Sequence, residues 1–544
     1  MIVDFKDSGF AAFDGSKHSS VQLSNNVIFS QNLLDLSMSI TTFIGIIHFS
    51  SKYTYTTGKQ NIIRKDCTPF IKYFPKVLAK TKKIDQTKDL YAILKIENII
   101  NNIIYCDVVQ YLGEICDQSI ESKFVQIACS SHWTNTKRIN QQFQEKSNID
   151  LTPNRKDYTH IDIFSIDPGG CVDVDDALHC TRVDNGYEVG IHIADVSSYI
   201  DENSELDYEL GQRVETIYPP NSSPIHMIPP ELAIAHISLL EGKPKRAFSV
   251  IIKLNDTFDI QTITFEKTII KVKNLTYEKA EEMKNILEDL YTVGQKLKKN
   301  IETAFPKDEV YDMHQMVAVY MIYANKFVAE KIQSFDPNNV LLRAHHEKEK
   351  ITQRTVDPIL HKKYNINLME QARYQLGSND CAHQGLNLEF YTHFTSPIRR
   401  YADIIVHRQL WKAINSTKIE RIDTKTIFLM NFYSKFYKQT ERYYHVITIA
   451  NILGNEYDIT DAYITYIDDC IKLYIPKYNL DYDYQICNYR MKDIISVIKD
   501  DNGVTIKNVQ TDKETRYELF QKVNVKIIAT TNHAIELNVS IKHF

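Results

Sequence analysis

The sequence predicts a multidomain α+β protein, with small β-barrels towards both ends and a mixed α/β domain between them. Near the N-terminus, short strand-like runs at 37–49, 91–96 and 104–111 are separated by polar turns. That spacing is typical of small antiparallel barrels. Near the C-terminus, apolar and polar residues alternate strictly, which predicts further strands. The middle third alternates strand-like runs with long helical segments, as an α/β domain does.

The 544 residues are enough for three or four domains, and the 43% hydrophobic and 24% charged fractions are ordinary for a globular protein. We place a partly flexible N-terminal segment at 1–25, because these residues are small and polar. OB-type barrels follow at 26–155, the α/β domain at 156–450 and a last OB-type barrel at 451–544.

Composition excludes several classes of protein. No apolar run reaches the roughly 18 residues of a membrane span, and acids stand at the start where a signal peptide carries Lys and Arg. Nine cysteines without a CxxC pair fit reduced thiols better than a disulfide framework or a zinc site. The net charge of −5 argues against bulk attraction to nucleic acid but leaves room for a local channel. We therefore expect an intracellular protein, cytoplasmic or nuclear.

An acidic stretch at 165–176, SIDPGGCVDVDD, carries Asp167, Asp173, Asp175 and Asp176 around a Pro-Gly-Gly turn. So many carboxylates repel one another unless a cation lies among them. Their hard oxygen ligands suit Mg²⁺ or Mn²⁺, and two such ions about 4 Å apart serve phosphoryl chemistry. The alternatives are a solvated acidic loop or a structural calcium site, although the ligand spacing does not fit an EF-hand.

Two long helices are predicted in the α/β domain, at 312–335 and 396–415. In the second, Ser396 is a good N-cap before a proline at the first helical position. Arg399 and Arg400 would then lie in the first turn, where free backbone N–H groups and the helix dipole favour an anion such as a phosphate. Arginines there are also common salt-bridge partners, which remains the alternative role for this pair.

Three blocks resemble the signatures of the ribonuclease II (RNB) superfamily of processive 3′→5′ exoribonucleases, closest to its eukaryotic exosome-associated branch. They are SIDPGGCVDVDDALH at 165–179, VGIHIADVS at 189–197 and YTHFTSPIRRYADIIVHRQL at 391–410. The resemblance implies cold-shock/OB barrels at the N-terminus, a central RNB domain and an S1-like barrel at the C-terminus. The N-terminal PIN endonuclease domain of some relatives is not expected.

The resemblance also implies an activity: hydrolysis of single-stranded RNA to 5′-nucleoside monophosphates, with Mg²⁺ as cofactor and Mn²⁺ as the alternative. The expected protein is a monomer without membrane contact, and association with an RNA-degradation complex is an open alternative. A second reading is a catalytically inactive RNA-binding subunit of such a complex. The intact set of four aspartates and the arginine pair argue against inactivity.

Individual residues receive roles from the matched motifs. Asp167, Asp173, Asp175 and Asp176 match the metal ligands of the family, and Arg399 matches its catalytic arginine. We assign Asp175, Arg399 and Arg400 to catalysis. The RNA-contacting residues are matched by Tyr218, Tyr277 and Glu441. His192, Asp195 and His345 also belong to the signature blocks, but we interpret them as structural.

One stretch departs from the family pattern. A helix that usually reads VEEFMLLAN is VAVYMIYAN here, so that Ala318 and Val319 replace two glutamates. One of those acids recognises the ribose 2′-OH in relatives, together with the tyrosine matched by Tyr277. We therefore expect weaker discrimination between RNA and DNA, or discrimination through Tyr277 or Tyr320.

A basic run in the N-terminal part is a candidate surface for the RNA backbone. A solvated lysine face is the alternative. Its members are Lys72, Lys76, Lys80, Lys82, Lys83 and Lys88.

Overall fold

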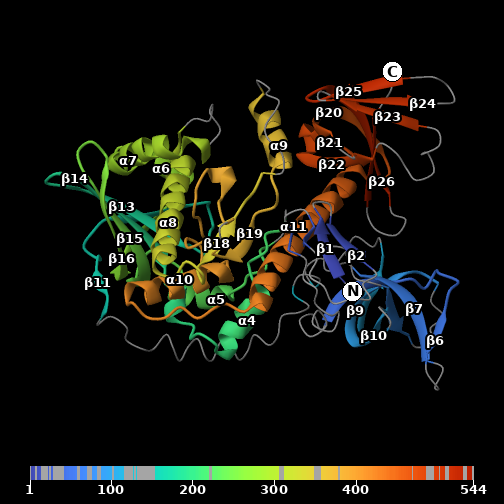
Figure 1. Cartoon of the computed structure of the whole chain (residues 1–544), viewed down its shortest axis with the longest axis horizontal. Coiled ribbons are helices and arrows are strands. Elements are labelled where there is room, and N and C mark those ends of the chain that lie inside the picture. Colours follow the sequence, from blue (N-terminus) through green and yellow to red (C-terminus); the bar gives the residue numbers. More distant parts are fainter. Residues whose placement is uncertain are drawn as a thin grey trace.

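The computed structural model has an α/β domain on one side and two β-rich parts, N-terminal and C-terminal, on the other, and the long helix α11 (Thr424–Leu453) lies between them (Figure 1). The structure describes short strands before residue 28, and then 42–57, 62–69, 76–81, 87–100 and 103–115 with three isolated positions up to 130. It also describes 154–219, 223–304, 311–347, 357–377, 380–467, 470–485, 495–500, 503–508, 514–530 and 536–541.

The N-terminal part contains a closed barrel. Its six strands lie in the order β5-β9-β10-β8-β7-β6, and an additional pairing of β5 with β7 closes the sheet. Alternate residues such as Phe43, Ile47 and Leu94 are buried inside it. The predicted barrel fold is thus confirmed. The strands are β5 (Thr42–Ile47), β6 (Tyr55–Thr57), β7 (Ile62–Pro69), β8 (Val77–Lys80), β9 (Leu90–Ile100) and β10 (Ile103–Glu114).

Short strands also occur before the barrel. β1 (Ile2–Lys6) pairs with β2 (Gly9–Phe13), and β3 (Gln22–Leu23) pairs with β4 (Asn26–Val27). Three of these strands fall in the segment for which the sequence predicts flexibility. The domain boundaries themselves stay predictions.

The central domain is built on a seven-stranded sheet in the order β11-β16-β15-β14-β13-β12-β17. The central strands β14 and β15 are almost wholly buried, because helices cover the sheet (Figure 1). The strands are β11 (Lys156–Asp157), β12 (Ile163–Asp167), β13 (Asp176–Val183), β14 (Gly186–Ala194), β15 (Lys245–Leu254), β16 (Ile260–Ile270) and β17 (Val272–Thr276). A separate hairpin pairs β18 (Leu341–Ala344) with β19 (Arg373–Leu376).

Helix α8 (Met313–Phe335) lies at the centre of this domain and confirms the helix predicted at 312–335. Asp312 is its N-cap and accepts a hydrogen bond from the backbone nitrogen of Gln315. The other helices are α4 (Glu205–Arg213), α5 (Pro230–Leu232), α6 (Tyr277–Glu282), α7 (Glu288–Lys298), α9 (Pro358–Leu368) and α10 (Tyr401–Ile414).

The second predicted helix begins later than the sequence indicates. α10 starts at Tyr401, and Ser396 is not its N-cap. The backbone nitrogen of Ser396 donates to Asp403 Oδ1 at 2.7 Å, and the Ser396 hydroxyl accepts from the Arg399 side chain at 3.0 Å. These bonds hold the residues before Tyr401 as a turn. Arg399 therefore precedes the helix, and Arg400 occupies the N-cap position.

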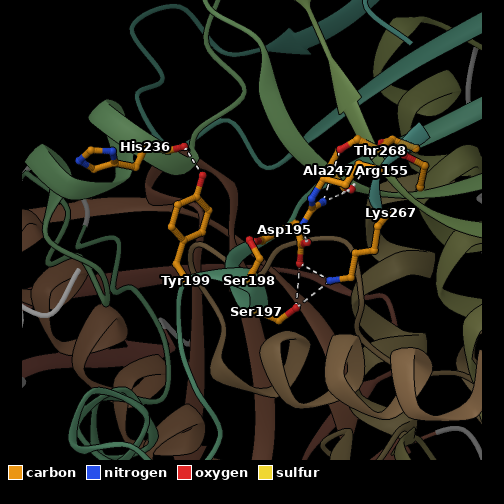
Figure 2. Close-up of polar contacts among 10 residues, drawn as sticks. Arg155, Asp195, Ser197, Ser198, Tyr199, His236, Ala247, Lys267 and Thr268 are labelled. Carbon is orange, nitrogen blue, oxygen red and sulfur yellow. Dashed lines mark hydrogen bonds and ion pairs between the residues drawn. The ribbon is translucent and has the colours of Figure 1, made fainter. Parts of the chain in front are cut away.

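A buried ionic cluster joins three strands of the central sheet (Figure 2). Asp195 is fully buried at the end of β14 and pairs with Arg155 at 2.5 Å and Lys267 at 2.6 Å. Burial alone would raise the pKa of Asp195, but Lys267 and Arg155 hold it well below its usual range. Arg155 also donates to the carbonyl oxygens of Ala247 and Thr268. These contacts support the structural interpretation of Asp195.

The C-terminal part has a five-stranded sheet in the order β22-β21-β20-β26-β27 and a three-stranded sheet β23-β24-β25. The predicted alternation is confirmed in β26 and β27, where Val525, Ile527 and Val539 point inward. The bounds are β20 (Tyr457–Ile467), β21 (Cys470–Ile475), β22 (Leu480–Gln485), β23 (Ile495–Asp500), β24 (Gly503–Asn508), β25 (Glu514–Glu518), β26 (Lys522–Thr530) and β27 (Glu536–Ile541). Among the helices described, none combines the length and the apolarity that crossing a bilayer requires.

Candidate active site

The acidic stretch forms a loop between β12 and β13, which pair antiparallel. Asp167 is the last residue of β12 and Asp176 the first of β13, so both lie at one edge of the sheet. The loop turns at Gly170, whose φ of +82° favours glycine. Val174 is buried and its backbone nitrogen bonds to the Ser238 hydroxyl at 2.9 Å. This anchor fixes the two aspartates that flank Val174.

The four carboxylates are held close together at low exposure. Burial and, to a smaller extent, the neighbouring Asp173 raise the pKa of Asp167 to about 6. Burial and then Asp167 raise the pKa of Asp176 to about 7. Burial also raises the pKa of Asp175, against the opposing effect of Arg399. Bringing carboxylates this near to one another without a cation is unfavourable.

The donor set fits a hard divalent cation. Asp167 Oδ2 and Asp175 Oδ2 are buried and accept no hydrogen bond, so each presents free lone pairs. All candidate donors are carboxylate oxygens, the ligands that Mg²⁺ and Mn²⁺ prefer. In the part of the chain that the structure describes, no three carboxylate, imidazole or thiol groups surround one point closely enough to hold an ion.

The two arginines have different surroundings. Arg399 Nε lies 3.6 Å from Asp175 Oδ2, and its side chain is 45% exposed. The backbone nitrogen of Ile398 donates to Asp175 Oδ1 at 2.8 Å, so this turn holds the carboxylate from two sides. Arg400 instead forms two 2.9 Å bonds to the fully buried Asp403. The sequence allowed either arginine to be a salt-bridge partner, and Arg400 is the one that forms this salt bridge.

Tyr218 connects the acidic loop with α11. Its hydroxyl donates to Asp173 Oδ2 at 2.8 Å, and its backbone nitrogen donates to Glu441 Oε1 at 3.3 Å. The ring remains 41% exposed. Burial and then Asp173 raise the pKa of the Tyr218 phenol, and burial raises that of Glu441. Residues 173, 218 and 441, far apart in sequence, therefore form one site.

Tyr277 lies on the opposite flank of the aspartates. It follows Thr276, which pairs with Asp167 across β17 and β12. Burial and, to a smaller extent, Asp176 and Asp167 raise the pKa of Tyr277 to about 12. The Tyr277 ring stacks on the exposed imidazole of His314, with centroids 3.6 Å apart and planes 7° apart.

His314 is a candidate site residue that the sequence interpretation missed. It lies in the first turn of α8, and its only sequence signal was a polar residue beside the N-cap of the predicted helix. Tyr320, considered as a second reader of the sugar, is fully buried and donates to the carbonyl oxygen of Leu290 at 2.6 Å. That expectation is wrong, because the hydroxyl points into the core. Val319 is also fully buried, whereas Ala318 is half-buried.

The described lysines of the basic run are each paired with acids. Lys76 lies 3.4 Å from Asp66, Lys80 lies 3.4 Å from Asp107, and Lys88 lies 2.6 Å from Glu114. These pairs weaken the case for a free phosphate-binding face. The remaining members lie outside the described residues, namely Lys72, Lys82 and Lys83.

The two signature histidines interpreted as structural are held by protein contacts. His192 is fully buried between the His179 ring at 2.8 Å and the Ser249 hydroxyl at 2.7 Å. His345 lies just after β18, where its backbone nitrogen bonds to the carbonyl oxygen of Ala382. Its ring packs against that of His383, with centroids 4.9 Å apart. Neither contact requires a ligand.

Comparison with known proteins places this geometry in a family. Residues 155–416 match the model of the RNB domain. The human exosome complex exonuclease RRP44 is 29% identical over 552 residues, covering 86% of this chain and 57% of the relative. The fission-yeast exosome complex exonuclease dis3 is 32% identical over 338 residues, covering 49% of this chain and 35% of the relative. The chain thus spans about half the length of the first curated relatives it matches, or less.

Solved structures agree in fold. The apo form of Mycoplasma genitalium RNase R superposes with a TM-score of 0.67 at 18% identity, covering 90% of this chain and 87% of that one. Yeast Ssd1, described as a pseudonuclease, superposes with a TM-score of 0.69 at 17% identity, covering 92% and 83%. At such identities the likeness shows the fold alone. The matched domain and the aligned relatives together show that residues 155–416 form an RNB domain, with similarity to the exosome-associated exonucleases.

Proposed function

We propose that this chain is a metal-dependent 3′→5′ exoribonuclease that degrades single-stranded RNA processively to 5′-nucleoside monophosphates. The observation that carries the proposal is the convergence of four aspartates and Arg399 at one edge of the sheet, with Tyr218 bonded to one of those aspartates. Relatives named as exonucleases, and an RNase R neighbour solved with single-stranded RNA, support this class of substrate.

The residues divide the work of phosphodiester hydrolysis. Asp167, Asp173, Asp175 and Asp176 would hold the divalent ions, which when bound supply Lewis acidity and lower the pKa of coordinated water. Arg399 is partly exposed beside Asp175 and can stabilise the extra negative charge that develops on the phosphate. The Ile398 amide and the Arg399 guanidinium orient the Asp175 carboxylate and oppose the rise in its pKa that burial causes.

Aromatic side chains on both flanks would hold the 3′ end. Tyr218 presents a half-exposed ring next to Asp173, and the Tyr277–His314 stack lies near Asp167 and Asp176. Stacking on such rings tolerates every base, which processive degradation requires. Glu441 fixes the backbone of Tyr218 and thereby the position of its ring.

A second candidate is an RNA-binding protein without nuclease activity. The fold similarity to yeast Ssd1, described as a pseudonuclease, is the specific observation that favours it. The complete set of acids together with Arg399 favours the active alternative. Either protein would act alone or join an RNA-degradation complex, as the exosome names of the relatives suggest.

The test is a time course with one oligoribonucleotide labelled at its 5′ end and a second labelled at its 3′ end. Mg²⁺, Mn²⁺ and Ca²⁺ are compared, each with and without chelator. The proposal expects release of labelled monophosphate from the 3′ end and direct passage of the 5′-labelled strand to a short limit product. Binding without cleavage under every ion condition would establish the inactive alternative, and tight Ca²⁺ binding without RNA binding would support a structural calcium site.

A further inference from the structure

Arg343 carries a buried guanidinium without a hydrogen-bond or ion-pair partner among the described residues. The residue is 6% exposed in β18, opposite Tyr374 of β19, and its guanidinium lies over the Tyr374 ring at 4.4 Å. Its backbone nitrogen bonds to the carbonyl oxygen of Tyr391, and no side chain or carbonyl of the described residues accepts from its guanidinium. A guanidinium has five donors and no acceptor, so these donors are available to water or to an anion.

Further cationic groups surround Arg343. Burial, and next Arg343 itself, lower the pKa of the Lys438 ammonium. Burial, and next His345 and Arg343, lower the pKa of His383 to about 3, so this imidazole is neutral and adds no charge. Two acids act on the pair: Glu215 interacts with Arg343 and Lys438, and Glu441 interacts with Lys438. Among the described residues, neither acid is bonded to the Arg343 guanidinium, whose donors are left without a protein acceptor.

This basic cluster, defined as Arg343 and Lys438, adjoins the candidate active site. Lys438 and Glu441 are one helical turn apart on α11, and Glu441 accepts from the backbone of Tyr218. Tyr218 in turn bonds to Asp173 with its hydroxyl. An RNA strand has its 3′ end at the aspartates in this arrangement, and its upstream nucleotides pass Tyr218. The next nucleotides would therefore contact the basic cluster.

The exposure of Arg343 is small but sufficient for a ligand to reach it. The fully buried polar atoms without partners include Asp167 Oδ2 and Asp175 Oδ2 but no nitrogen of Arg343, so its guanidinium keeps contact with solvent. The Tyr374 ring covers one face of the guanidinium, and the donors lie in its plane. A planar fork of this kind matches two oxygens of a phosphate.

We propose that Arg343, assisted by Lys438, binds one phosphate of the RNA strand upstream of the scissile linkage. The inference rests on the proposed function, because it assumes that the 3′ end lies at the aspartates. The ligand is a backbone phosphate and not a base, since the fork offers donors only. Loss of such a charge-assisted contact is expected to weaken binding about 10- to 100-fold.

The test measures RNA binding in chelator, so that hydrolysis does not interfere. A series of oligoribonucleotides carries one uncharged methylphosphonate linkage, moved stepwise from the 3′ end. Wild-type protein should lose about tenfold or more in affinity at one upstream position, and Arg343→Met should be insensitive to that position while remaining sensitive to the others. The same penalty at every position in both proteins would overturn the proposal.

Three variants complete the experiment. Arg343→Lys keeps the charge but not the fork, so its affinity should fall between those of wild type and Arg343→Met. Arg182→Met is the matched control, because Arg182 also lies over a tyrosine ring, Tyr187, but is exposed at the far end of β13. It should bind RNA as the wild type does. Arg343→Met should also reduce the salt dependence of binding by about 0.7 in log–log slope, the value for one phosphate on a single strand.

The outcomes separate the inference from the proposed function. RNA binding with the expected phosphate dependence but no hydrolysis would reject only the exonuclease. Normal hydrolysis with unchanged affinity in Arg343→Met would reject only the phosphate site. If Arg343→Met does not fold, wild type and Arg343→Lys are compared for RNA affinity with and without the uncharged linkage at the sensitive position. Equal affinities and an equal loss at that linkage in both proteins would reject the phosphate site.

Discussion

The hydroxyl of Tyr218 donates a 2.8 Å hydrogen bond to Oδ2 of Asp173, although 45 residues separate them. One carboxylate of the acidic loop is thus joined to an aromatic ring that remains 41% exposed. A nucleotide stacked on this ring would lie beside the aspartates. We therefore expect binding of the last nucleotides and the chemical step to be coupled through Tyr218.

Tyr218→Ala should lengthen the limit product, because the last few nucleotides depend most on a ring near the aspartates. Tyr218→Phe keeps the ring but removes the bond to Asp173, so the product length should stay near wild type while the rate changes. The measurement is the pattern of end products on a denaturing gel. An unchanged pattern in Tyr218→Ala would remove the residue from the binding site.

Asp175→Asn should abolish hydrolysis and change RNA affinity by no more than about twofold. RNA affinity should depend mainly on base stacking, which contributes about 1–3 kcal/mol per base and which this substitution does not alter. The amide oxygen can still accept from the Ile398 nitrogen, so the turn should persist, but the negative charge for a metal is lost. Turnover is compared with binding of a labelled oligoribonucleotide in chelator. Turnover near wild type would contradict the metal assignment.

Arg399→Ala and Arg400→Ala should fail in different ways. Removing Arg399 should slow the chemical step by roughly 10²–10³-fold, the scale for loss of one transition-state charge donor. Removing Arg400 leaves Asp403 buried without its bidentate partner, which should cost about 3–5 kcal/mol of folding stability. Single-turnover rates and denaturant unfolding of both variants distinguish the roles. A purely catalytic defect in Arg400→Ala would restore it as a site residue.

Discrimination between ribose and deoxyribose should be modest and should depend on the Tyr277–His314 stack. Neither Ala318 nor Val319 can accept a hydrogen bond from the 2′-OH, a contact of about 1–3 kcal/mol. The degradation rates of matched oligoribo- and oligodeoxyribonucleotides are measured for wild type, Tyr277→Phe and His314→Phe. The ratio of the RNA rate to the DNA rate should fall in at least one variant. Ala318→Glu should raise the ratio.

Tyr320→Phe is the control for this series, because the Tyr320 hydroxyl bonds in the core. It should lower stability and leave the ratio unchanged. A sharp preference for RNA that survives Tyr277→Phe and His314→Phe, with no gain from Ala318→Glu, would show that sugar recognition lies elsewhere.

Three buried histidines should make a contribution to folding stability that is lost as the solution is acidified below pH 6.5, and the raised pKa values of Asp167 and Asp176 act in the opposite direction. His192, His383 and His407 are buried, and burial lowers the pKa of His383 to about 3 and of His407 to about 4, and that of His192 well below 6.5. The folded chain therefore keeps these imidazoles neutral, whereas the unfolded chain takes up protons near pH 6.5. Their contribution to stability is full above that value and is lost as the pH decreases.

As the pH is lowered from 7.5 to 5.5, each of these histidines should cost about 1.4 kcal/mol of folding stability, or roughly 4 kcal/mol for the three together. Denaturant unfolding across this range measures the slope. His407→Gln should remove about one proton from the pH dependence, whatever its effect on absolute stability. An equal slope in wild type and variant would mean that His407 is protonated in the folded chain.

The sequence by itself determined the fold class and the RNB signature motifs, and it named the residues that we propose for the chemistry. Period-two alternation of apolar residues is a local pattern, so the strands containing Val525 and Val539 were predictable. The four aspartates and Arg399 lie in two contiguous motifs, and contiguous motifs can be read without coordinates. The helix predicted at 312–335 was equally local, since a helix depends on residues close in sequence.

Only the tertiary structure decided which side chains face the site. Arg399 and Arg400 are adjacent in sequence, yet Arg400 pairs with Asp403 whereas Arg399 lies beside Asp175. The reason is that α10 begins only at Tyr401, so that both arginines precede the helix. His314 became a site candidate only through its stack on Tyr277, and Tyr320 ceased to be one through its burial. Partners distant in the chain determine burial and charge pairing, and no short sequence window contains both members of such a pair.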